Sequence, residues 1–344
     1  MNTKILKKLI PLTISSALTF SLVTGCSAAS AEKNSADSGN DLQTLRVAVM
    51  TGQPDQYTTF IGTEEGIFEK YGIKLEITEY VAGINTIDAV VNGTADTGEM
   101  ADYALVNRIG NTLHDTNLVI FSELYASEIL TGGLYVAPEF ENNLAALDGS
   151  KGFISMVGTV SDYYTSVAIE KLGLDETKQN IINADYSTTL AIAQKNDASA
   201  VVAFGTSGSK YEEYGWKLAV SSSDWGLKTG SYLLTTSEFG KNYSELLGNY
   251  LKATQESIDY INANLDSVAS RVAARYGVVE ENFKNDWTSR TYGIGTTKDG
   301  ADYLNTIEKW AFEHGKFPED YSVTDFYDTS AIDAAFPDRN TLTK

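Results

Sequence analysis

The sequence has few of the residues that build disulfide, metal and nucleic-acid sites. One cysteine among 344 residues excludes a disulfide framework, a cysteine-rich zinc site and an iron–sulfur cluster. Two distant histidines, His114 and His314, leave little for a histidine-based metal site. Acidic residues outnumber basic ones by 46 to 26, whereas nucleic-acid binding needs a surplus of lysine and arginine. We therefore expect no cofactor, no metal ion and no nucleic-acid partner.

Motifs for catalysis and phosphate binding are also missing. The sequence contains no phosphate loop with its lysine, no G-x-G-x-x-G run after a strand and no H-E-x-x-H helix. The segment 205–209 (GTSGS) lacks the G-x-S-x-G spacing of a nucleophile elbow. These absences favour a protein that is not an enzyme.

The N-terminal residues have the pattern of a bacterial export signal with a lipid-attachment site. Three lysines precede an apolar stretch over 9–23, which at about fifteen residues is shorter than the roughly 20 that span a bilayer. The run 23–26 (VTGC) resembles a lipobox, in which small residues precede a cysteine that is lipidated and heads the mature chain. We therefore expect a signal peptide over 1–25, lipidation of Cys26, and a flexible tether over 26–43.

From residue 44 onward, apolar strands alternate with helices. Glycine or turn residues end most of these segments, as expected for short elements. From 239 onward the pattern is mainly helical. The alternation predicts an α/β fold with mostly parallel sheets covered by helices. The predicted strands are 45–50, 73–77, 117–121, 134–137, 153–157, 181–186, 200–204 and 218–221, and the helices between them include 57–71, 161–172, 188–195 and 210–214.

Several runs resemble the nitrate/sulfonate/taurine-type substrate-binding proteins of ABC importers. Residues 65–73 (EGIFEKYGI) are similar to the family's "ekGfFekyGl" run, and 91–102 (VNGTADTGEMAD) to its "nGeaDfg..gd" run. Further along, 147–152 (LDGSKG), 158–161 (GTVS) and 197–198 (DA) resemble its "dLkGkki", "GSSS" and "vDAw" segments. The matching runs follow one another in the family's order.

This resemblance implies a two-lobed, periplasmic-binding-protein-like fold whose lobes are joined by two crossover hinge strands. It places lobe 1 at 44–133 and 232–344, and lobe 2 at 134–231. It also implies a monomer that closes on a small-molecule ligand and delivers it to an ABC permease and its ATPase. With the export signal, we expect the protein on the extracytoplasmic face of the cell membrane, held only by its lipid anchor, in a Gram-positive-type envelope.

Ligands of open α/β sheets bind beyond the carboxyl ends of the strands, where loops enter helices. Loops of this kind are expected at 52–57, 98–103, 158–163 and 204–207. Their backbone N–H groups and helix N-termini bind an oxyanion without a charged side chain. Ser161 is either a hydroxyl donor to the ligand or the N-cap of its helix. The candidate ligand-binding residues are Gln53, Tyr57, Glu99, Met100, Asp102, Thr159, Ser161, Tyr163, Phe204 and Gly205.

The charge of the ligand stays open. Arginine is the usual partner of a simple anion, and there is no arginine between Arg108 and Arg271, so the predicted second lobe contains none. Glu99 and Asp102 lie in the pocket loops, so a zwitterion fits both the helix ends and the carboxylates. A neutral or cationic aromatic, such as a pyrimidine-like compound, fits the tyrosines. We favour a sulfonate-like or zwitterionic organic acid.

Two rival functions share the resemblance. Pyrimidine-synthase relatives have this fold, but they carry a cysteine-rich segment and a catalytic histidine that are not visible in this sequence. A lipoprotein that presents its ligand to a membrane sensor, instead of a permease, has no distinguishing motif. The sequence therefore predicts a binding protein without enzymatic activity, and leaves open whether it serves import or sensing.

Overall fold

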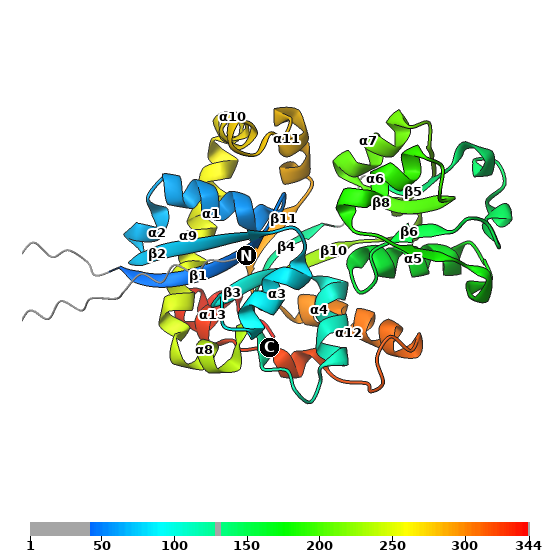
Figure 1. The fold of residues 1–344 in the computed structure, drawn as a ribbon. Helices are drawn as coiled ribbons and strands as arrows, with labels where there is room; N and C mark the ends of the chain where they lie inside the picture. The colour runs from blue at the N-terminus through cyan, green and yellow to red at the C-terminus, as the bar shows by residue number, and fades with distance from the viewer. Residues whose placement is uncertain (1–41, 128–131, 343–344) are drawn as a thin grey trace, which may run out of the picture. The chain divides into compact units, whose positions relative to one another are not determined.

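The computed structural model describes residues 42–127 and 132–342. These residues form two β-sheets with helices on their faces (Figure 1). The predicted signal peptide, Cys26 and the tether up to residue 41 lie outside the described residues. No helix in the described ranges has the length and apolar character needed to cross a membrane.

Sheet A has six strands in the order β11-β4-β10-β3-β1-β2. Strand β1 pairs in parallel with β2 and β3, whereas β10 pairs antiparallel with β3 and β4, and β11 pairs antiparallel with β4. One edge of the sheet is therefore parallel and the other antiparallel. The strands are β1 Gln43–Met50, β2 Ile73–Tyr80, β3 Thr97–Ala101, β4 Leu118–Ser127, β10 Thr229–Thr236 and β11 Thr291–Gly295.

Sheet B has five strands in the order β7-β6-β8-β5-β9. Strand β6 pairs in parallel with β7 and β8, and β5 pairs antiparallel with β8 and β9. All five strands come from one continuous stretch of the chain, so sheet B is inserted between the strands of sheet A. The strands are β5 Gly132–Val136, β6 Phe153–Ser155, β7 Ile181–Asn183, β8 Ala200–Phe204 and β9 Lys217–Ser221.

The two-lobed α/β fold with two crossovers is confirmed, but the prediction of mostly parallel sheets is wrong because both sheets are mixed. Strand β4 leads the chain out of sheet A and β10 brings it back, so these two strands run in opposite directions and pair. In sheet B, β5 brings the chain in and β9 leads it out, and these two strands also pair antiparallel. No hairpin turn joins either pair, so the sequence carried no local signal that these strands pair with each other.

The lobe boundaries at 134 and 231 remain a proposal. The last strand of sheet A before the insertion ends at Ser127, and the first strand of sheet B begins at Gly132. The last strand of sheet B ends at Ser221, and the chain is back in sheet A from Thr229.

The helices mostly follow the predicted pattern, with one break that glycine causes. The helix expected over 57–71 is two helices, because Gly66 has φ of 66°, in the left-handed region that other residues avoid. The helices are α1 Pro54–Glu64, α2 Ile67–Lys70, α3 Gly83–Val91, α4 Asp102–Asn111, α5 Val160–Lys171, α6 Tyr186–Gln194, α7 Gly205–Glu213, α8 Ser237–Asn242, α9 Ser244–Ala263, α10 Leu265–Tyr276, α11 Glu280–Thr288, α12 Lys298–Glu313 and α13 Ser330–Ala335.

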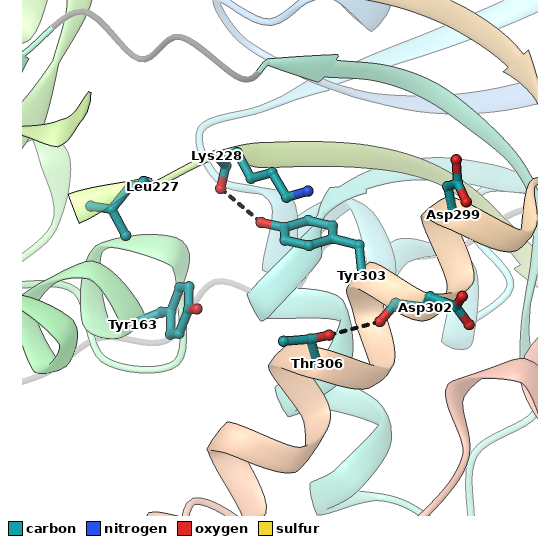
Figure 2. A pocket seen from close by; sticks show the side chains of 8 residues that line it. Tyr163, Leu227, Lys228, Asp299, Asp302, Tyr303 and Thr306 are labelled. Carbon is teal, nitrogen blue, oxygen red and sulfur yellow. Dashed lines mark hydrogen bonds between the residues drawn. The ribbon is translucent and has the colours of Figure 1, made fainter. Parts of the chain in front are cut away.

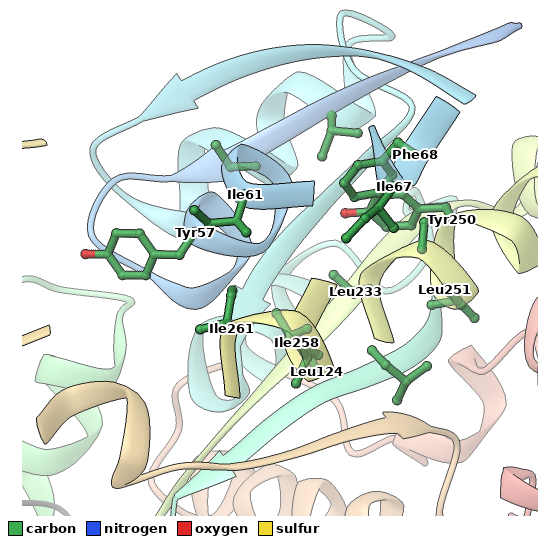
Figure 3. Close-up of a cluster of buried hydrophobic side chains, with 14 of the residues drawn as sticks. Tyr57, Ile61, Ile67, Phe68, Leu124, Leu233, Tyr250, Leu251, Ile258 and Ile261 are labelled. Carbon is green, nitrogen blue, oxygen red and sulfur yellow. The ribbon is translucent and has the colours of Figure 1, made fainter. Parts of the chain in front are cut away.

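A large apolar cluster holds α1 and α9 together over one face of sheet A. Figure 3 shows Tyr57 and Ile61 of α1 together with Ile258 and Ile261 of α9, in the same cluster as Leu233 of β10. All five side chains are at most 5% exposed. Burying a side chain of this size stabilises the fold by roughly 1.5–3 kcal/mol. The packing fixes the N-terminus of α1, which directly follows β1.

Candidate functional site

A cavity of about 410 Å³ lies at the carboxyl ends of strands from both sheets, and we call it the deep cavity. From sheet A it is lined by Met50 at the end of β1 and Ala101 at the end of β3. From sheet B it is lined by Phe204 at the end of β8 and Met156 just beyond β6. Open α/β sheets bind their ligands at this position.

Four of the predicted binding residues line the deep cavity: Gln53, Glu99, Ser161 and Phe204. Each comes from a different one of the four predicted loops, with Glu99 on a strand of sheet A and Phe204 on a strand of sheet B. The amide oxygen of Gln53 accepts a hydrogen bond from the hydroxyl of Tyr125 at 3.3 Å. The deep cavity thus brings together side chains that are more than 150 positions apart in the sequence.

Thr159, and not Ser161, is the N-cap of α5. Its hydroxyl oxygen accepts the N–H of Ser161 at 3.2 Å and its hydroxyl donates to the carbonyl of Met156 at 2.7 Å. The capping role considered for Ser161 is therefore wrong, because the helix already begins at Val160. Ser161 lies in the first turn, where its hydroxyl lines the deep cavity.

Met100 and Tyr57 lie in apolar clusters and are not among the residues that line the deep cavity. Successive residues of a strand point to opposite faces of the sheet, so Met100 is directed away from the face that Glu99 occupies. Tyr57 lies within α1, with its ring 5.0 Å from that of Phe283 in an edge-to-face arrangement. Both side chains are at most 5% exposed.

Tyr163 lies where α5 meets helices of the sheet A lobe. Its ring stacks on Tyr103 at 5.2 Å and lies 4.8 Å from Trp310 of α12. It lines a second, more open hollow of about 560 Å³, which we call the α12 hollow. Gly205 is the first residue of α7.

Glu99 is buried in the deep cavity with one oxygen satisfied and one not. It is 2% exposed, and its Oε1 accepts a hydrogen bond from the Ser231 hydroxyl. Its Oε2 has no hydrogen-bond partner among the described residues. Burial raises the pKa of Glu99 to about 7, while the Ser231 hydroxyl and the charge of Arg290 lower it and Asp102 raises it further.

Asp102 is fully buried and each of its oxygens accepts hydrogen bonds. Oδ1 accepts the N–H of Tyr103 at 2.6 Å, and Oδ2 accepts the N–H of Gly230 at 2.8 Å and the hydroxyl of Tyr303 at 2.9 Å. Burial raises the pKa of Asp102 to about 6, and these donors oppose the shift. Asp102 therefore ties α4 to the start of β10 and to α12, and it is not among the residues that line the deep cavity.

Tyrosines from both lobes hold the second crossover at the carbonyl of Lys228. The hydroxyl of Tyr303 lies 2.7 Å from this oxygen and that of Tyr164 lies 3.1 Å from it. Figure 2 shows the Tyr303 contact beside the α12 hollow, with the lysine side chain over the tyrosine ring at 4.5 Å. The segment that enters β10 is thus fixed from two sides.

Arg290, Tyr125 and Tyr164 are among the residues of the deep cavity that were not predicted. Arg290 precedes β11, a strand that the sequence pattern did not indicate. Tyr125 lies in β4, and the guanidinium of Arg290 is 5.0 Å from the centre of its ring. Tyr164 follows Ser161 by three positions, so the two side chains share a helix face. This spacing indicates that Tyr164, and not Tyr163, lines the same cavity as Ser161.

The described ranges contain no cluster of three or more His, Cys, Asp or Glu side chains placed to bind a metal ion. The carboxylates in and around the deep cavity are therefore candidate partners for polar groups of an organic ligand.

Comparisons with known proteins identify the fold and the family. The family model described as "NMT1/THI5 like" matches residues 53–267, more than half of the chain. The periplasmic aliphatic sulphonate binding protein SsuA from Escherichia coli superposes with a TM-score of 0.69 at 15% identity, over 86% of this chain and 99% of that one. No curated protein sequence matches the chain.

Two further solved structures have the same architecture. The alkanesulfonate-binding protein SsuA from Xanthomonas axonopodis pv. citri, bound to MOPS, gives a TM-score of 0.70 at 11% identity, over 83% of this chain and 98% of that one. The periplasmic nitrate-binding protein NrtA from Synechocystis PCC 6803 gives 0.62 at 12% identity, over 87% of this chain and 86% of that one. At these identities the likeness establishes the periplasmic-binding-protein fold.

Proposed function

The chain belongs to the NMT1/THI5-like family, and from that premise we propose that it is an extracytoplasmic binding protein that captures a small organic ligand and delivers it to an ABC importer. The observation that carries this proposal is the deep cavity, which residues of both sheets line at their strand ends. Because two crossovers connect the lobes, rotation about them opens and closes the cavity around a ligand. Ligand binding then selects the closed form, which is the form delivered.

A sulfonate-like or zwitterionic organic acid is the ligand that we favour. Ser161 lines the deep cavity in the first turn of α5, so its hydroxyl and the positive end of the helix dipole are available to an acid group. Two of the structural neighbours are named as sulfonate-binding proteins and one as a nitrate-binding protein. The alternative ligand, a neutral or cationic pyrimidine-like aromatic, is supported by the rings of Tyr164, Phe204 and Tyr211 in the cavity wall.

We expect binding without chemical conversion of the ligand, by a monomer that works with a permease and an ATPase. The lipobox-like run 23–26 supports attachment to the extracytoplasmic face of the cell membrane through Cys26. Lipid anchoring retains a binding protein where no outer membrane does so, which supports a Gram-positive-type envelope.

The first test is a thermal-shift screen of the purified protein against alkanesulfonates, aminosulfonates, nitrate, pyrimidines and amines. A ligand at about 100 times its Kd stabilises the native state by roughly 2.7 kcal/mol, which raises Tm by several degrees. We expect such a rise with at least one organic acid or zwitterion and an unchanged ligand after incubation. Repeated chemical conversion of a ligand, at a rate proportional to the protein concentration, would contradict a binding function.

Replacement of the only cysteine tests the anchor. We expect Cys26→Ala to move the protein from the membrane fraction to the soluble fraction and to abolish incorporation of labelled palmitate, because stable anchoring needs the attached acyl chains. Ser27→Ala, one position beyond the lipobox-like run, is the matched control and is expected to leave the protein in the membrane fraction. A Cys26→Ala protein that stays with the membranes would exclude this mode of attachment.

A further inference from the structure

Glu99 lines the deep cavity as a buried carboxyl with only one of its two oxygens hydrogen-bonded by the described residues. Strand β3 places it opposite Leu233 of β10, and Ser231 on that strand satisfies only one of its oxygens. A buried carboxylate oxygen without a hydrogen-bond donor normally costs about 1–3 kcal/mol or more. The other buried acid nearby, Asp102, receives three donors from the protein. No described residue supplies a donor to this oxygen, and Glu99 lines the deep cavity, so a ligand in the cavity is a source for the missing donor.

The charges around Glu99 favour a positive group. Asp102 of α4 is buried, and its negative charge raises the pKa of Glu99. Among the described residues that line the deep cavity, Arg290 is the one positive side chain. Its guanidinium, however, forms an ion pair with Asp286 and packs on the ring of Tyr125, so much of its charge is already matched. A simple anion placed against Glu99 would meet the charge of Glu99 itself at pH 8 and that of Asp102 behind it.

The remaining cavity wall suits the carbon skeleton of an organic cation. Tyr164, Phe204 and Tyr211 contribute aromatic rings, and Met50 and Leu190 contribute apolar side chains. Aromatic faces attract cationic nitrogen and pack against the methylene groups next to it. The wall therefore accepts the same class of ligand that the carboxyl of Glu99 selects.

We propose that Glu99 binds a positively charged nitrogen of the ligand through Oε2, so that the ligands of this protein carry an ammonium or a similar cationic group. The inference rests on the proposed binding function and narrows it. Among the organic acids favoured above, it selects zwitterions over simple anions. The acid group of such a ligand then lies toward the first turn of α5, where Ser161 lines the cavity.

Matched probe pairs that differ only in the nitrogen test this inference. Suitable pairs are 3-aminopropane-1-sulfonate with propane-1-sulfonate, and benzylamine with benzyl alcohol, titrated by calorimetry at pH 8. The variants are Glu99→Gln, which keeps the acceptor for Ser231 but removes the charge, and Glu308→Gln. Glu308 is the matched control because it is also a buried glutamate, 5% exposed, whose Oε1 accepts the N–H of Tyr321 at 3.1 Å outside the deep cavity.

In the wild type we expect the aminated member of at least one pair to bind about tenfold or more tightly than its partner, which corresponds to one charge-assisted contact. In Glu99→Gln this ratio should fall to about one, and in Glu308→Gln it should persist. Equal or weaker binding of the aminated members, or a ratio that survives in Glu99→Gln, would overturn the inference while leaving a binding function in place. If no probe binds, aminated or not, both the inference and the proposed function fail.

Discussion

Glu99→Gln is expected to raise the free energy of unfolding at pH 8 by about 3 kcal/mol relative to the wild type. The pKa of Glu99 is raised from 4.5 to about 7, mainly by burial. At pH 8 the native wild type therefore contains a buried charge that it has ionised at a cost, whereas glutamine carries none. The amide oxygen of the variant still accepts the hydrogen bond that the Ser231 hydroxyl donates.

The pH dependence has a defined sign. Between pH 4.5 and 7 the native state holds a proton on Glu99 that the unfolded state has released, so this group lowers the stability of the wild type as the pH rises. The difference between variant and wild type should therefore be small near pH 4.5 and reach its full size above pH 7. Urea denaturation at both pH values measures it.

Glu141→Gln is the matched control, because Glu141 is exposed and the same substitution there removes a charge that water already solvates. We expect it to change stability by less than about 0.5 kcal/mol at either pH. A Glu99→Gln protein that is no more stable than the wild type at pH 8 would mean that Glu99 is adequately solvated or paired. A gain in stability together with a loss of affinity would identify Glu99 as a residue kept for binding at the expense of stability.

Asp102→Asn is expected to gain little or no stability at pH 8, unlike Glu99→Gln. Removing the buried charge returns about 3 kcal/mol, but each buried donor left without an acceptor costs about 1–3 kcal/mol. Asp102 is also a buried acid with a raised pKa, but both of its oxygens accept hydrogen bonds, from Tyr103, Gly230 and Tyr303. An asparagine has only one oxygen. Its NH₂ group must face either the N–H of Tyr103 or that of Gly230, and the donor there is left buried without an acceptor.

The same urea experiment measures the net change, with the exposed Asp115→Asn as the control that makes the same chemical change. A second consequence concerns the crossover, because Gly230 and Tyr303 fix the chain around Lys228. If Asp102→Asn gains as much stability as Glu99→Gln, the donors around Asp102 must find other acceptors and the acid is not a structural tie.

The sequence predicted elements whose apolar residues form an uninterrupted or regular pattern. Strand β8 has the predicted bounds, Ala200–Phe204, because five consecutive residues of apolar character precede a glycine. Helix α5 begins and ends within one residue of the prediction for the same kind of reason. The family resemblance then supplied the two-lobed fold, which local patterns do not specify.

The strands that were missed carry buried polar residues. In β10, Ser231 and Thr235 are fully buried, and their hydroxyls donate to Glu99 and to the carbonyl of Asp96. These partners lie more than 130 positions away, so no local pattern shows that the hydroxyls are satisfied inside a sheet. Arg290 was missed as a cavity residue for a related reason, since β11 after it contains two glycines and resembles a turn.

The pairing between β4 and β10 also bears on the order in which the two lobes fold. Ser127 and Thr229 are partners in this ladder, so forming it alone closes a loop of about 100 residues, which costs about 2 kcal/mol more conformational entropy than closing a loop of ten. In sheet B, Gly133 and Ser221 are partners in the ladder between β5 and β9. Once sheet B has formed, the two ends of the inserted segment are close together. Pairing β4 with β10 then costs about as little conformational entropy as closing a short loop. We therefore expect the insertion to form before the ladder between β4 and β10 closes.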